Sequence, residues 1–149
     1  MDDNTRFLAA ILKQDWELYD ALVDEFDRQG KGTPVAVIAV AFDRLTKQVF
    51  SGSVDRAAVI RFVADARAFF PEGKDIDPRL AEALVCATVN IDEPGIIELI
   101  ESVDVGPIAE TEGQLLFKMV HDRQMSHDEI DAFLRDVESQ LAQLQGGAS

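Results

Sequence analysis

Eight consecutive apolar residues, 35–42 (VAVIAVAF), constrain the fold of this chain more than any other feature. They follow Thr33, whose hydroxyl suits a helix N-cap, and Pro34, whose fixed φ suits a first helical position. Because every side chain over these two turns is apolar, we expect a helix that is buried on all sides. The charged residues that follow end the run well short of the roughly 20 residues that a membrane span needs. The sequence therefore predicts a buried central helix that begins at Pro34 and ends near Phe50.

The prolines indicate that the rest of the chain is helical as well. Each stands where a helical chain tolerates it, at an expected helix start or just after a helix end. No segment alternates strictly between apolar and polar residues, and the chain has no Asn-Gly or Asp-Gly hairpin turn. We therefore predict an all-α fold, a compact bundle of seven or eight helices around the central helix. Residues 1–145 are expected to form one domain and 146–149 a disordered tail. The five prolines are Pro34, Pro71, Pro78, Pro94 and Pro107.

Capping residues and helical spacing set the expected limits of the other helices. Residues 5–28 fit one long helix, with a break at Asp15 as the alternative, and Gly30 suits the residue just beyond its end. Near the C-terminus the sequence Ser-His-Asp-Glu forms a capping box that starts the last helix at Ser126. Ser53 is the expected cap of a helix over 54–70, and the polar connection 71–77 is expected to be exposed. Further helices are expected over 78–89, from Pro94 and from Pro107, and the helix from Pro107 is expected to be broken or weakened at Gly113.

The charge of the chain bears on its partners and its compartment. The 149 residues carry a net charge of −14, which disfavours nucleic acid and anionic membranes as direct partners because both would repel the chain. Cys86 is the only cysteine, so no internal disulfide can form, and its apolar neighbours predict a buried, reduced thiol. The first residues are acidic, where a signal peptide would be basic. A cytoplasmic location is the expectation.

Residues 80–117 contain no lysine or arginine. Several consecutive helices are therefore expected to present only negative charge, which suits a basic partner protein or weak binding of divalent cations. A solvated acidic face is the alternative. The carboxylates predicted to bind a partner are Glu93, Glu98, Glu101, Asp104, Glu110 and Glu112.

No motif for a reaction, a metal or a cofactor has all the residues that its chemistry requires. Residues 27–38 resemble a calcium loop, but Lys31 stands where an oxygen ligand is needed and the final glutamate is replaced by Ile38. His121 and His127 each precede an aspartate, but no third histidine completes a metal site. The chain has no GxSxG, no GxGxxG, no phosphate-binding glycine loop and no HExxH. We therefore assign no catalytic, cofactor-binding or metal-binding residue.

Two apolar stripes have alternative readings. In the last helix Ile130, Leu134, Val137, Leu141 and Leu144 keep heptad spacing over two heptads, which suits packing against the domain or a dimer seam. Trp16, Tyr19 and Phe26 share a stripe on the first helical segment, which suits a core or the floor of a ligand pocket.

Two functions follow from these features. The first is a non-catalytic acidic helical protein that acts through protein–protein interaction, either by self-association or with a basic partner. The alternative is a protein that binds a small molecule or a divalent ion, or an enzyme, with its site between helices.

Overall fold

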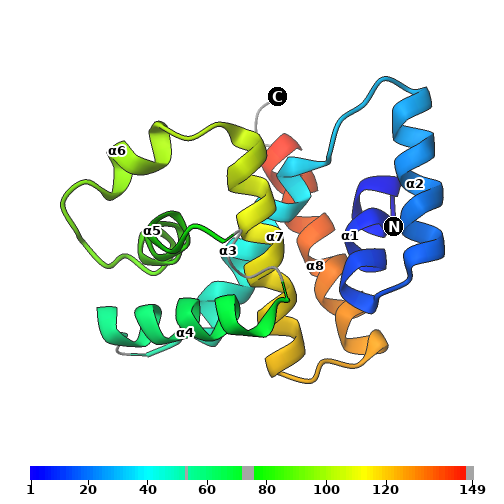
Figure 1. Cartoon of the computed structure of the whole chain (residues 1–149). Coiled ribbons are helices and arrows are strands. Elements are labelled where there is room, and N and C mark those ends of the chain that lie inside the picture. The colour runs from blue at the N-terminus through cyan, green and yellow to red at the C-terminus, as the bar shows by residue number, and fades with distance from the viewer. Residues whose placement is uncertain (53, 72–75, 147–149) are drawn as a thin grey trace. The chain divides into compact units, whose positions relative to one another are not determined.

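The computed structural model describes residues 1–52, 54–71 and 76–146. Across these ranges the chain forms eight helices and no strand, which confirms the predicted all-α class (Figure 1). No helix in the described ranges is long and apolar enough to cross a bilayer. The chain divides into two compact units, residues 1–41 with 120–149 and residues 42–119, which are described separately. The helices are α1 Asp3–Lys13, α2 Trp16–Arg28, α3 Val35–Val49, α4 Arg56–Phe69, α5 Pro78–Thr88, α6 Ile96–Glu101, α7 Val105–Asp122 and α8 His127–Gly146.

The first unit begins with a helical hairpin made by α1 and α2. The chain breaks at Asp15, whose carboxylate caps α2 by accepting a hydrogen bond from the Leu18 amide at 3.2 Å. The alternative with a break is therefore correct, and the single long helix is wrong. Phe7 packs against Tyr19 and Phe26, with ring centroids 5.3 and 5.7 Å apart, so aromatic side chains hold the two helices together.

Helix α8 packs against α1 in the same unit. Its start is the predicted capping box, because Ser126 and Glu129 exchange hydrogen bonds between side chain and backbone. Hydrogen bonding by Ser126, first through its backbone amide and then through its side chain, lowers the pKa of the Glu129 carboxyl. Its first half packs as expected, with Ile130, Leu134 and Val137 buried, whereas Leu144 is 60% exposed. The helix runs to Gly146, one residue into the expected tail, and 147–149 lie outside the described residues.

Helix α3 starts at Val35, one residue later than expected. Val37, Ile38, Ala41, Phe42 and Leu45 are buried, which gives the helix the apolar core predicted for it. Burial on every side is wrong in one respect, since two alanines, Ala36 and Ala39, are exposed. An exposed methyl group presents little apolar area to water, so composition alone could not distinguish that face.

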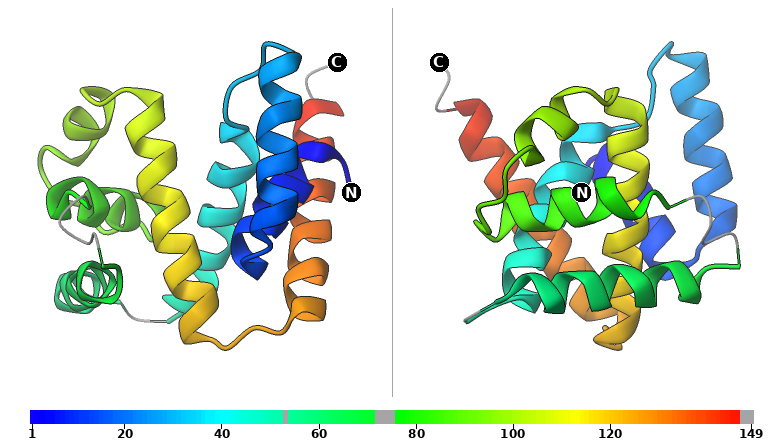
Figure 2. Two further views of the ribbon diagram at one scale, coloured as in Figure 1. Left: turned by 45° about the vertical axis from the view of Figure 1, so that its right-hand side comes forward. Right: turned by 60° about the vertical axis from the view of Figure 1, so that its left-hand side comes forward.

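The second unit holds α4, α5 and α6, which pack in chain order, and most of α7. In both views of Figure 2, α4 and α5 lie side by side. Asp55 caps α4 through the Ala58 amide at 2.9 Å, so this helix starts later than expected, and Ser53 lies outside the described residues. Asp77 caps α5 through the Arg79 amide at 2.9 Å. The neighbouring Ile76 is fully buried, which corrects the expectation of a wholly exposed connection.

Helix α7 runs through Gly113 without a break, so the alternative of a broken helix is wrong. Leu115, Leu116 and Met119 follow the glycine and are buried. That packing outweighs the roughly 1 kcal/mol by which glycine disfavours a helix interior.

Candidate functional site

The acidic residues predicted to bind a partner lie on α6, in the turn after it and on α7. Glu98 and Glu101 are exposed and three residues apart on α6, a spacing that places them on one helix face. Asp104 is exposed immediately before α7, and Glu110 is exposed on that helix. Figure 1 shows α6 as a short helix between the connection from α5 and the connection into α7.

Two large apolar side chains of this region are exposed. Helix α6 has four apolar residues among six, of which three are partly buried and one, Ile97, is exposed. Ile97 is 58% exposed, and Val105 at the start of α7 is 62% exposed. We use the term α6 surface for the exposed residues Ile97, Glu98, Glu101, Asp104 and Val105. It holds three acidic and two apolar residues and no cation.

Glu93 differs from the other predicted carboxylates because it already has a cationic partner. Its two carboxylate oxygens each lie 2.8 Å from Nη1 of Arg56, the first residue of α4. Its side chain is 25% exposed. The charge of Glu93 is therefore compensated locally, by an arginine that stands outside the cation-free segment. The sequence gives no local signal for a pair of residues so far apart in the chain.

Glu112 differs for another reason. It is only partly exposed, on the part of α7 that belongs to the second unit. Burial, with a smaller contribution from the Asp43 carboxylate, raises the pKa of Glu112 to about 7. Burial therefore favours the neutral form of this carboxyl, and Glu112 contributes less to a negative surface than the exposed carboxylates do.

A small pocket of about 210 Å³ lies between α5 and α6. Its lining balances Arg56 and Arg79 against Glu82 and Glu93, so it has no net charge to select an ion. Cys86 also lines it, but the residue is only 3% exposed, as predicted. Burial raises the pKa of the Cys86 thiol, which keeps it protonated and a poor nucleophile.

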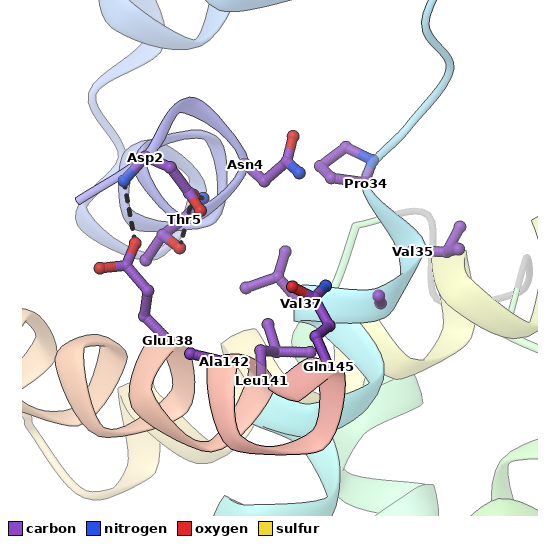
Figure 3. A pocket seen from close by; sticks show the side chains of 11 residues that line it. Asp2, Asn4, Thr5, Pro34, Val35, Val37, Glu138, Leu141, Ala142 and Gln145 are labelled. Atoms are coloured by element: carbon purple, nitrogen blue, oxygen red, sulfur yellow. Dashed lines mark hydrogen bonds between the residues drawn. The ribbon is translucent and has the colours of Figure 1, made fainter. Parts of the chain in front are cut away.

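A larger pocket, of about 310 Å³, lies within the first unit between the start of α1, the first turn of α3 and the end of α8 (Figure 3). We call it the α1–α8 pocket. Asp2 and Glu138 line one end, and Val37, Leu141 and Ala142 supply apolar wall. The Asp2 amide donates a hydrogen bond to Glu138 Oε2 at 2.9 Å, which ties α1 to α8 beside the pocket. Neither lysine nor arginine lines it.

The remaining sequence candidates are dispersed. His121 and His127 are exposed, and no three acidic, histidine or cysteine side chains within the described ranges converge as metal ligands. Trp16 is 51% exposed and meets the Tyr19 ring edge-on at 5.7 Å. The aromatic stripe thus contributes to the core through Tyr19 and Phe26, and Trp16 lies at its edge.

Neither the protein-family models, nor the curated proteins, nor the solved structures contain a match to this chain. The function proposed below therefore rests on the residues of this chain alone.

Proposed function

We propose that this protein is a non-catalytic binding module whose α6 surface holds a basic segment of a partner protein. The observation that carries the proposal is that Ile97 of α6 is 58% exposed beside two exposed carboxylates, while the other three apolar side chains of the helix are only partly buried. Exposed apolar area is costly in water, at roughly 25 cal/mol per Å². A partner that covers Ile97 and Val105 would recover that free energy on binding.

The charge around these side chains supports a basic partner. Glu98 and Glu101 are exposed on the same short helix as Ile97, Asp104 directly precedes Val105, and residues 80–117 contain no lysine or arginine. Lysine and arginine have long apolar stems beneath their charges, so a segment that carries them can satisfy both parts of the surface. An amphipathic helix with a mixed basic and apolar face is the partner whose chemistry fits best.

Self-association fits the surface less well. Two copies of a chain with a net charge of −14 repel each other, and this surface would bring acidic groups against acidic groups. We therefore expect the isolated protein to have the native mass of a 16.4 kDa monomer in solution. A stable dimer that Glu98→Lys breaks would favour self-association and contradict the proposal.

The test uses a labelled synthetic amphipathic helix of leucine and lysine as the probe, with fluorescence anisotropy as the readout. We expect the double variant Glu98→Lys/Glu101→Lys to bind it at least about fivefold more weakly, since two exposed attractions become repulsions. Binding should also weaken as salt shortens the Debye length from about 30 Å at 0.01 M to about 3 Å at 1 M.

The matched control is Asp20→Lys/Asp24→Lys on α2, which changes the net charge equally at two exposed sites in the other unit. The control should bind the probe as the wild type does, apart from a small loss of long-range attraction. Equal weakening in both double variants would mean that net charge alone draws the probe, and the proposal would be wrong.

A further inference from the structure

We propose that the α1–α8 pocket binds a small organic ammonium ion, namely a primary amine with a short alkyl chain. This site is independent of the α6 surface, because all residues that line it belong to the first unit. Either site can therefore be disproved without affecting the other.

The charge of the lining selects a cation. Asp2 and Glu138 are the only charged residues that line the pocket. Asp2 accepts hydrogen bonds from the Thr5 amide and hydroxyl, both at 2.9 Å and both through Oδ1. Glu138 uses Oε2 for the Asp2 amide. Both carboxylates lie at the same end of the pocket, so their negative charges can attract an ammonium group there.

The rest of the lining suits an alkyl chain. Figure 3 shows Leu141 and Ala142 of α8 on the side of the pocket opposite Asp2 and Thr5, with Val37 of α3 between them. Val37 is 2% exposed and gives the pocket a dry wall. The volume of about 310 Å³ is at the small end of the range for ligand pockets, roughly 300–1,000 Å³.

Other ligand classes fit less well. A calcium ion takes six to eight oxygen ligands, and no group of three or more metal-ligating side chains occurs in the described ranges. An anion would meet two carboxylates and no cation. An alkylammonium ion needs only an acceptor for its charge and apolar wall for its chain, and the pocket offers both.

The test uses hexylamine, which is protonated at neutral pH because alkylammonium groups, like that of lysine, have a pKa near 10.4. We expect an NMR titration of the full chain to shift the amides of Thr5, Val37 and Ala142, and hexanol, of the same shape without the charge, to bind at least about tenfold more weakly. Equal binding of hexanol, or shifts confined to other residues, would overturn the proposal.

Two variants test the contribution of the Glu138 charge to binding. Glu138→Gln removes the negative charge but keeps an acceptor for the Asp2 amide, and we expect it to weaken hexylamine binding about tenfold. Glu17→Gln makes the same chemical change at an exposed position of α2 and should leave binding unchanged. Similar losses in both variants would show general attraction to an acidic protein and would overturn the site.

Ala142→Leu places a larger side chain in the pocket, and Ala132→Leu places it on an exposed position of the same helix outside the pocket. We expect only Ala142→Leu to abolish binding, with the amide spectrum elsewhere unchanged, which shows that the variant is folded. Binding by a folded Ala142→Leu variant at wild-type affinity would also overturn the proposal.

Discussion

Helices α5 and α6 follow each other in the chain, pack against each other and are both rich in apolar residues, but they bury very different amounts of surface. Helix α5 buries Leu80, Ala81, Ala83, Leu84, Val85 and Cys86, whereas α6 buries none of its residues. Their N-termini differ too, because the Asp77 side chain caps α5, whereas the N-cap of α6 is Gly95, which has no side chain to provide a cap. Helix α5 is part of the core, and α6 lies on it as an outer layer.

The difference shows that the apolar content of a helix does not determine how much of it is buried, because burial also depends on which neighbouring elements cover the helix. The six residues of α6 make less than two turns, and an isolated helix of that length is marginal in water. Its four apolar residues cannot all face α5. The exposed part of the helix carries Ile97, Glu98 and Glu101, which is the basis of the proposed function.

Truncation of one side chain in each helix should give the largest contrast. Leu84→Ala in α5 removes a side chain that is only 6% exposed, and we expect a loss of about 2–5 kcal/mol in the free energy of unfolding. Ile97→Ala in α6 should change that free energy by less than about 0.5 kcal/mol, because the side chain is mostly in water. Urea unfolding of both variants measures the difference, and equal losses would mean that α6 belongs to the core.

Two carboxylates of α7 also differ in their burial. Glu110 is exposed, whereas Glu112 is partly buried and its pKa is raised to about 7 by burial and, to a smaller extent, by Asp43. In the unfolded chain Glu112 titrates near 4.5. Between these values the folded state binds more protons than the unfolded state, so stability is lost as the pH rises from about 4.5 through 7.

Replacement of Glu112 should remove this loss. The full shift would correspond to about 3 kcal/mol at 1.36 kcal/mol per pKa unit, and partial exposure to solvent reduces our expectation to about 1–2 kcal/mol. Glu112→Gln should therefore be more stable than the wild type at pH 8 by about that amount, and the two should converge towards pH 4.5. Glu110→Gln is the control and should follow the wild-type curve. If the stability of Glu112→Gln also followed the same pH dependence as the wild type, the raised pKa of Glu112 would be contradicted.

Local chemistry explains why most of the helix limits could be predicted from the sequence. Asp15, Asp77 and Ser126 each cap a helix with their own side chain, so the signal lies within a few residues of the structure that it specifies. The burial of Cys86 follows from its apolar neighbours for the same reason. The exposure of Glu98 and Glu101 could be predicted because both side chains are charged.

The features that were missed depend on contacts between distant residues or on unusual backbone. Arg56 pairs with Glu93 from another helix, and Asp2 meets Glu138 from the other end of the chain. Gln14 adopts a left-handed conformation with φ of 60°, where glycine is the usual signal for a helix end. The α1–α8 pocket exists only because three separated segments converge, so no local motif could indicate it.

Hydrogen–deuterium exchange of α5 and α6, with and without the basic amphipathic peptide, tests the central claim most directly. The account predicts that α5 amides are protected in both samples, whereas α6 amides exchange quickly in the free protein and slow down when the peptide is added. If α6 is already as protected as α5 in the free protein, or if the peptide protects α2 and leaves α6 unchanged, the α6 surface is not the binding site.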